Sequence, residues 1–147
     1  DADYLAFLRD CVAGKDVRFL VELDDTGVQE LLHQAGVFVH ASSHFNYRGE
    51  FHPKPELLAL APLEALASGL TTLVSDAGAL PELGVLPGCY VFRTEAQLAA
   101  LLQDVAHGRL PQQQAEVMHG AVTERYGLVT VGTRLLEMMK VVTPCAS

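Results

Sequence analysis

The sequence contains no tryptophan, few cysteines and no apolar run long enough to cross a membrane. A membrane-spanning helix needs about 20 consecutive apolar residues, and the longest candidate, Leu57–Leu63, is short and is broken by Pro62. Cys11, Cys89 and Cys145 are far apart and form no Cys-x-x-Cys pair. Such an odd, scattered set indicates reduced thiols and predicts a cytoplasmic location. Cys11 and Cys89 stand among apolar residues, so both are expected to fill the core.

Positive charge is also scarce, because 10 Lys and Arg residues face 18 Asp and Glu residues and give a formal net charge of −8. A nucleic-acid surface needs clustered basic side chains, so the sequence argues against a nucleic-acid partner. One local concentration of basic and imidazole side chains could supply positive charge beside a phosphate. It comprises His40, His44, Arg48, His52 and Lys54.

The chain has 147 residues, of which 50% are hydrophobic, so it is long and apolar enough to bury a core. We therefore expect one domain over residues 1–147, with its last helices between 111 and 142. Four apolar segments are predicted to be buried strands: Val17–Leu23, Val37–Ala41, Thr71–Ser75 and Cys89–Phe92. Helical patterns are found at Asp3–Gly14, Asp25–Ala35, Pro62–Ser68, Thr94–Gly108, Pro111–Tyr126 and Val129–Val142.

This alternation predicts an α/β fold in three layers, with a parallel sheet covered by helices on both faces. In such sheets, ligands bind at the carboxyl ends of the strands. The loops after Leu23, Ala41 and Ser75 are therefore expected to form the site. The loop from Ser42 to Pro55 is long for a compact domain, and loops of that length are usually functional or disordered.

The segment Pro55–Leu83 carries most of the chemistry, because it holds Glu56 and Glu64 on either side of a predicted helix start. Pro62 suits the first helical position, which would make Glu64 the third residue of a helix that ends at Gly69. A helix N-terminus attracts anions, and flanking carboxylates can accept hydrogen bonds from sugar hydroxyls. The pattern suits a nucleotide sugar, although a glutamate at the third position is also common for capping alone.

The order of these segments resembles the C-terminal domain of retaining glycosyltransferases with the two-domain GT-B fold, most closely the large family 4, or group 1, type with its Glu-x7-Glu motif. The resemblance covers about Asp3 to Gly108, and more loosely the C-terminal helices. It implies a Rossmann-like C-terminal half of that fold, and the transfer of a sugar from a nucleoside diphosphate sugar to a hydroxyl acceptor. It implies no bound catalytic metal and no cofactor, because the nucleotide sugar is a substrate whose base the sequence does not identify.

The resemblance also assigns roles to matching positions. Glu56 takes the catalytic position against the donor sugar, and Glu64 binds the ribose hydroxyls. Further donor-binding positions are the backbone of Leu58, Ala59 and Leu60, the strand end Phe19, Leu20 and Val21 beside the base, and Ser42. The family often has glycine where Ala59 stands and usually has glycine where Val21 stands.

A larger departure concerns the diphosphate, which the family holds with an Arg and a Lys in a G-R-x-x-x-x-K-G segment that this sequence lacks. The acceptor-binding N-terminal domain is missing too. We therefore expect a fragment of a larger enzyme that is inactive in transfer on its own. The resemblance allows a peripheral membrane association of that full enzyme. A binding or interaction remnant of the same fold, without catalysis, is the second hypothesis.

Three other kinds of site match parts of the sequence less well. A phosphoacceptor receiver domain would gather Asp24, Asp25 and Asp76 around Mg²⁺, but the lysine expected after a later strand is absent and Arg93 is the nearest basic residue. A dinucleotide-binding dehydrogenase would need a G-x-G-x-x-G segment after a strand, and none is present. A metal site would draw on three histidines of the basic segment. These are His40, His44 and His52.

Overall fold

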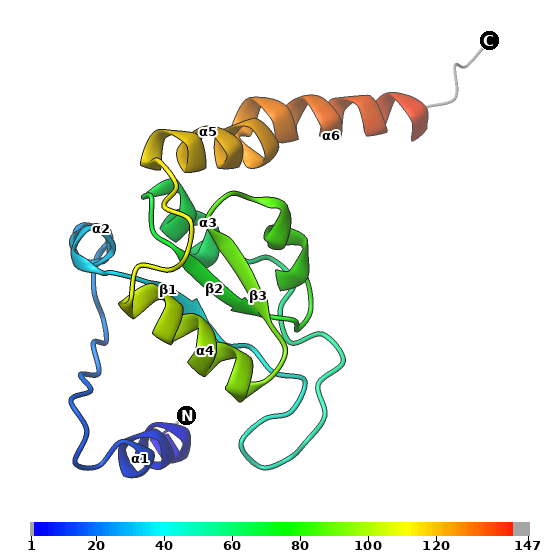
Figure 1. Cartoon of the computed structure of the whole chain (residues 1–147). Helices are drawn as coiled ribbons and strands as arrows, with labels where there is room; N and C mark the ends of the chain where they lie inside the picture. Colours follow the sequence, from blue (N-terminus) through cyan, green and yellow to red (C-terminus); the bar gives the residue numbers. More distant parts are fainter. Residues whose placement is uncertain (1, 143–147) are drawn as a thin grey trace.

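The computed structural model describes residues 2–142, with the side chains of residues 3–140 (Figure 1). Six α-helices, three strands and one 3-10 helix are assigned within this range. In chain order they are α1 (Ala2–Cys11), α2 (Asp25–Gln34), β1 (Phe38–His40), α3 (Leu60–Ala67), β2 (Thr72–Ser75), η1 (Leu80–Val85), β3 (Cys89–Phe92), α4 (Glu95–Ala106), α5 (Ala115–Tyr126) and α6 (Leu128–Val142).

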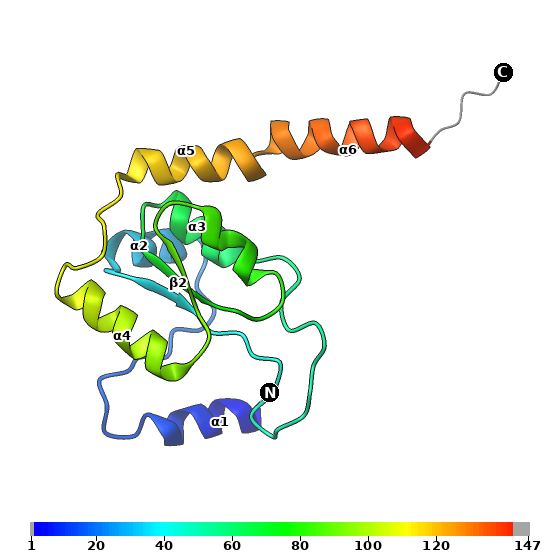
Figure 2. The same cartoon turned by 45° about the vertical axis from the view of Figure 1, so that its right-hand side comes forward.

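The three strands form one parallel sheet in the order β1-β2-β3. Phe38 pairs with Thr72, and Thr72 pairs with Cys89. The helix α3 packs against β1 and β2, and α4 lies on the opposite side of the sheet (Figures 1 and 2). The expected three-layer α/β class, with a parallel sheet between helices, is confirmed. All three strands end at the same edge, where the 42–55 loop begins.

The core lies between α3, β2, η1 and α5. Its most deeply buried side chains include Leu66, Val74, Leu80 and Met118, each no more than 2% exposed. Burying a side chain of this size contributes about 1.5–3 kcal/mol. The core therefore fixes β2 and α3, the two elements that flank the Glu56 segment.

Several predicted elements are confirmed with small shifts. The strand predicted at Cys89–Phe92 forms β3 with the same bounds, and Thr71–Ser75 contains β2. The helix predicted from Thr94 forms α4, where the Thr94 hydroxyl accepts a hydrogen bond from the amide of Gln97 at 3.2 Å. Local hydrophobic pattern and capping chemistry were sufficient signals for these elements.

The strand predicted at Val17–Leu23 is wrong, so the described sheet has three strands and not four. This segment is irregular, and most of its apolar side chains are exposed, with Val21 at 66%. A strand is stabilised by the neighbours it pairs with and packs against. The segment pairs with none of the described strands, so its apolar composition alone does not make it a strand.

One helix start agrees with expectation and another differs. The helix α2 begins at Asp25 as predicted, and Asp24 caps it by accepting a hydrogen bond from the amide of Gly27 at 2.8 Å. The helix α3 begins at Leu60, so Pro62 is its third residue. A proline is tolerated there because the first-turn amides have no partner within the helix. Glu64 is consequently the fifth residue of α3, on its second turn, and not the third.

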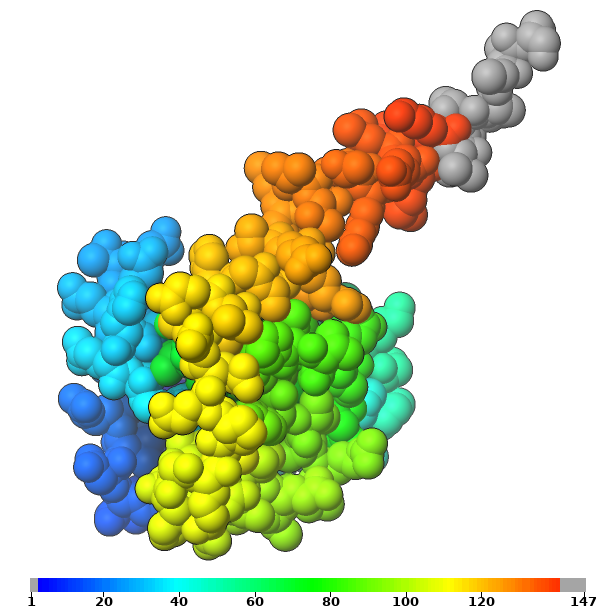
Figure 3. Space-filling model, turned by 45° about the horizontal axis from the view of Figure 1, so that its top comes forward, coloured from blue at the N-terminus to red at the C-terminus, as the bar shows by residue number. Residues whose placement is uncertain are grey.

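The helix α6 extends away from the rest of the chain, as the space-filling view shows (Figure 3). Its first residue, Leu128, is 89% exposed, and several further apolar side chains along it are exposed as well. Across residues 2–142, no helix combines the length and the apolar character needed to cross a membrane.

The two cysteines with described side chains have opposite environments. Cys89 is buried at the start of β3, as expected, and desolvation raises the pKa of its thiol to about 11. The expectation that Cys11 fills the core is wrong, because it is exposed at the end of α1. Cys145 lies outside the described residues.

We predict that a maleimide at about pH 8 labels Cys11 quickly and Cys89 slowly, because the reactive species is the thiolate. Burial and a raised pKa both lower the amount of accessible thiolate at Cys89. Peptide mapping by mass spectrometry after timed labelling measures both rates. In denaturant the two rates should converge. Equal rates in the native protein would contradict the buried position of Cys89.

Candidate functional site

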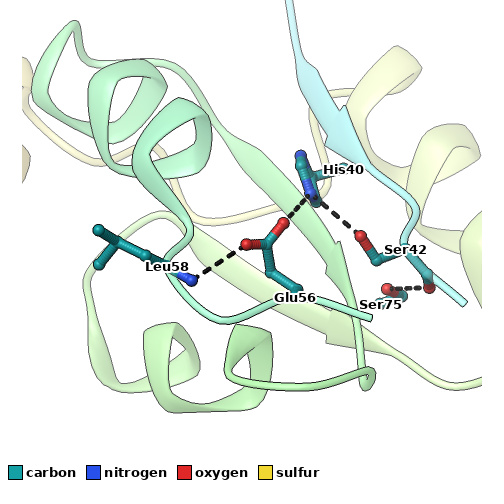
Figure 4. A network of polar contacts seen from close by, with 5 residues as sticks. All are labelled: His40, Ser42, Glu56, Leu58 and Ser75. Carbon is teal, nitrogen blue, oxygen red and sulfur yellow. Dashed lines mark hydrogen bonds and ion pairs between the residues drawn. The ribbon is translucent and has the colours of Figure 1, made fainter. Parts of the chain in front are cut away.

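Glu56 lies in the segment before α3, beside the carboxyl end of β1 (Figure 4). Its Oε2 is 3.1 Å from Nε2 of His40, the last residue of β1, and its Oε1 accepts a hydrogen bond from the amide of Leu58 at 3.1 Å. The side chains of His40 and Glu56 are 26% and 19% exposed. Both carboxylate oxygens are therefore held in place at a partly enclosed position.

Ser42 and Ser75 connect the ends of β1 and β2 to this pair. The Ser42 hydroxyl is 3.3 Å from Nε2 of His40, and the Ser75 hydroxyl donates to the Ser42 carbonyl at 2.7 Å. These contacts are drawn in Figure 4. Because strands β1 and β2 are adjacent and parallel, the bond from Ser75 fixes the first residues of the 42–55 loop.

The arrangement of Ser42, His40 and Glu56 differs from a nucleophilic triad. In a triad, the serine and the carboxylate use opposite ring nitrogens, so that the imidazole takes a proton from the serine. Here both partners lie on Nε2. An ionised carboxylate only accepts hydrogen bonds, so when Glu56 is ionised Nε2 donates to it and is not available to take a proton from Ser42. The cluster positions Glu56 and does not activate Ser42.

The backbone of Glu56 is held by the loop that follows β2. The Ala79 amide donates to the Glu56 carbonyl at 3.1 Å. Gly78 has φ +58°, and a Cβ placed on it would overlap the Glu56 carbonyl oxygen. Only glycine fits this close approach at a positive φ.

Glu64 lies away from the cluster formed by Glu56, His40 and Ser42. It is exposed on α3 and lines a depression of about 570 Å³ between α2, α3 and α5. Asp25 and Gln29 of α2 and His119 of α5 line the same depression, whereas Glu56 does not. The expectation that both carboxylates flank the α3 N-terminus is therefore wrong for Glu64, because α3 begins two residues earlier than predicted.

The backbone positions expected to approach the donor are Leu58, Ala59 and Leu60. Their amides differ in their hydrogen-bond partners. Leu58 donates to Glu56, and the Leu60 amide donates to the Leu58 carbonyl at 3.0 Å. Ala59, the N-cap residue of α3, has no side-chain cap and is 6% exposed. Its amide has no hydrogen-bond partner among residues 2–142.

The segment predicted to border the base comprises Phe19, Leu20 and Val21. Among the described residues, no polar contact connects this segment to Glu56 or Glu64. Leu20 and Val21 are exposed, and Phe19 lies under the guanidinium of Arg9, with 5.9 Å from the guanidinium carbon to the ring centroid.

The alternative metal sites find no support in the structure. Asp24 caps α2, and Asp76 lies 3.7 Å from the Arg93 guanidinium. His44 contacts the backbone carbonyl of His52 through Nδ1 at 3.1 Å. Within the described residues, no group of three His, Cys, Asp or Glu side chains could hold a metal ion. Among the described residues, neither the three aspartates nor the three histidines named for these hypotheses form such a group.

Sequence reasoning placed His40 at a strand end but missed its contact with Glu56. The two residues are 16 positions apart, so no local periodicity connects them. The usable signal was topological, because His40 ends a predicted strand at the edge where ligands of α/β sheets bind.

A comparison with protein-family models identifies the chain. Residues 6–115 match the family described as glycosyl transferases group 1. The match covers more than half of the chain, and it includes Glu56, Glu64, Ser42 and Gly78. The chain therefore belongs to the glycosyl transferases group 1 family, which supports glycosyl transfer in general. Comparisons with curated proteins and with solved structures found no match.

We predict that Gly78→Ala destabilises the protein more than Gly108→Ala. Gly108 is a matched control, because it has φ +63° and no atom lies within 4 Å of the position that an added methyl group would take. The control change should cost about 1–2 kcal/mol from its left-handed backbone. The change at Gly78 should cost about 1–3 kcal/mol more, because its Cβ would overlap the Glu56 backbone. Urea unfolding of both variants measures the difference, and equal losses would contradict the close approach.

Proposed function

We propose that this chain is the nucleotide-sugar-binding domain of a retaining glycosyltransferase of the GT-B, family 4 type. The observation that carries the proposal is the group 1 family match over residues 6–115, together with the Glu56 cluster at the carboxyl edge of the sheet. The spacing of Glu56 and Glu64 fits the Glu-x7-Glu motif. The reaction would move a sugar from a nucleoside diphosphate sugar to a hydroxyl acceptor.

Glu56 would orient the donor sugar. Its two oxygens already have fixed partners in His40 and Leu58, and each carboxylate oxygen can accept a second hydrogen bond. A sugar hydroxyl could therefore donate to a carboxylate whose position is set in advance. Pre-positioned acceptors of this kind cost little reorganisation when the substrate binds.

Glu64 would accept hydrogen bonds from the ribose hydroxyls. Its side chain is exposed in the depression beside α2, which leaves the carboxylate accessible. An acidic residue that binds ribose hydroxyls is a recurrent feature of nucleotide-binding α/β sheets. Because Glu56 precedes α3 and Glu64 is on the second turn of that helix, a bound nucleotide would have to extend past its first turn.

The diphosphate would lie at the α3 N-terminus. Ala59 provides no side-chain cap and its amide has no protein partner in the described range. The positive end of the helix dipole favours an anion there, and it would stabilise the charge that develops on the leaving diphosphate.

The second hypothesis is binding without catalysis by the same fold. The sequence lacks the G-R-x-x-x-x-K-G segment that the resemblance associates with the diphosphate. Isothermal titration with nucleoside diphosphates and their sugar conjugates, followed by a transfer assay of the protein purified from its native source with the same donors, separates the two hypotheses. Binding with transfer by the native protein supports the enzyme, and binding without transfer by the native protein supports the second hypothesis.

We predict that Glu64→Ala weakens nucleoside diphosphate binding more than tenfold, because two ribose hydroxyls lose their acceptor. Isothermal titration measures the dissociation constant, and circular dichroism checks the fold. Glu137→Ala is the control, since it removes the same charge from exposed α6, outside the matched residues. An unchanged dissociation constant in folded Glu64→Ala would overturn the ribose assignment.

We predict that Glu56→Gln weakens binding of the sugar conjugate and leaves binding of the bare nucleoside diphosphate unchanged. The amide keeps the shape of the side chain but loses the charge and one acceptor. The affinity for the sugar conjugate should fall about tenfold, which is ~1.4 kcal/mol, while the affinity for the bare nucleoside diphosphate should stay the same. An equal loss for both ligands would contradict a sugar-specific role for Glu56.

A further inference from the structure

The depression beside Glu64 lies between α2, α3 and α5 (Figure 2), and two of its walls are helix faces. Its α2 wall comprises Asp25, Val28, Gln29 and Leu32, whose spacing of i, i+3, i+4 and i+7 places them on one side of the helix. Because α2 has no buried residue, the core does not use this side. The volume of about 570 Å³ is in the range of small-molecule sites.

Most polar groups of this depression are hydrogen-bond acceptors. Among the residues with described side chains, the carboxylates of Asp25 and Glu64 have no ion-pair partner. Nδ1 of His119 is 3.2 Å from the Ala67 carbonyl oxygen, which only accepts, so Nε2 of the neutral ring is an acceptor as well. No Lys or Arg of the described range lines the depression. The lining therefore suits an uncharged ligand group that offers N–H and O–H donors.

A second depression, of about 510 Å³, has a lining of the opposite kind. It lies along α1, the end of β1 and the 42–55 loop, and it is lined by His52 and Lys54 and by no carboxylate. Positive side chains favour anions, whereas carboxylates favour N–H and O–H donors. Of the two depressions, the one beside Glu64 is therefore the better match for the nucleoside part of a nucleotide sugar.

A carboxylate at Asp25 discriminates between the common bases. Guanine carries two adjacent donors, the N1–H group and the N2 amino group, which match the two oxygens of one carboxylate. Uracil presents its single N–H between two carbonyl oxygens. Adenine and cytosine present an amino group beside a ring nitrogen that carries no hydrogen. In these three bases a lone pair would face the second carboxylate oxygen, so only guanine makes both hydrogen bonds.

The rest of the α2 wall fits the same base. Gln29 is one turn after Asp25 on the same side of the helix, so its amide can donate to guanine O6, the atom next to N1. Val28 and Leu32 offer apolar contact to the flat face of a base, and Val28 is 39% exposed. Asp25 is also available for a ligand, because the side chain that caps α2 is that of Asp24.

We propose that this depression selects guanine, that Asp25 is the residue that determines this specificity, and that the donor is therefore a guanosine diphosphate sugar. Asp25 accepts hydrogen bonds from the N1–H group and the N2 amino group, and the base lies against the α2 wall. The inference rests on the proposed function, because the ribose contact of Glu64 brings the base into the depression that both residues line.

The test is isothermal titration of the protein purified from its native source, and of variants made in the same chain. The probes are the diphosphates of guanosine, inosine, xanthosine and uridine. Guanosine diphosphate should bind at least tenfold more tightly than uridine diphosphate. It should also bind at least tenfold more tightly than inosine diphosphate, which differs from it only by the missing N2 amino group.

Asp25→Asn should change the preferred base, which loss of structure alone would not do. The asparagine side chain offers one acceptor and one donor, which match the N1–H group and the O2 atom of xanthine. Guanosine diphosphate should bind at least tenfold more weakly, xanthosine diphosphate at least tenfold more tightly, and uridine diphosphate as before. Glu95→Gln is the control. Glu95 is the first residue of α4 and follows a capping side chain, as Asp25 does in α2, but it does not line the depression.

Equal affinity for guanosine and uridine diphosphates, or an Asp25→Asn variant with the base preference of the unmodified protein, would overturn guanine selection and leave the proposed function standing. Glu64→Ala should weaken all the diphosphates alike, because each has the same ribose. If no nucleoside diphosphate binds, the proposed function fails, and titration with guanosine decides the base site. Guanosine binding that Asp25→Asn weakens would support the site, and no binding would overturn it.

Discussion

The close approach of Gly78 to the backbone of Glu56 is the constraint on which the site depends. It joins the loop after β2 to the segment before α3, and the Ala79 amide adds a hydrogen bond to the Glu56 carbonyl. With the backbone held, the Glu56 carboxylate needs only two contacts, from His40 and the Leu58 amide, to be fixed in direction. The buried residues of β2 and α3 provide the rigid support that such a position requires.

Buried contacts are unevenly distributed along the chain. The two candidate positions, Glu56 and Glu64, differ in how much of the core lies beside them. The described core is formed by α3, β2, η1, β3 and α5. By contrast, α2 has no buried residue, and the segment from Val17 to Leu23 exposes most of its apolar side chains. Regions with few buried contacts open at lower free energy than the core. The Glu56 cluster lies on the stable part, whereas the depression beside Glu64 has one wall, α2, on the less stable part.

The sequence predicted those elements whose signals are local. β3 follows from a short apolar run, and α4 follows from Thr94 as a cap before a helical period. The prediction failed where a partner was needed, because Val17–Leu23 has strand composition but pairs with none of the described strands. The predicted first residue of α3 was also wrong. Pro62 is acceptable at both the first and the third helical position, so its presence does not determine where the helix begins. The contact of His40 with Glu56 depends on tertiary structure and has no local signal.

One stretch of chain, from Ser42 to Glu64, forms part of both depressions. Ser42 and Pro55 line the pocket on the α1 side, and Glu64 lines the depression on the α2 side. Glu56 lies between them in sequence and contacts the histidine that Ser42 also contacts. Glu56 itself lines neither depression. Its carboxylate is therefore positioned by the contacts with His40 and the Leu58 amide, and not by the walls of either depression.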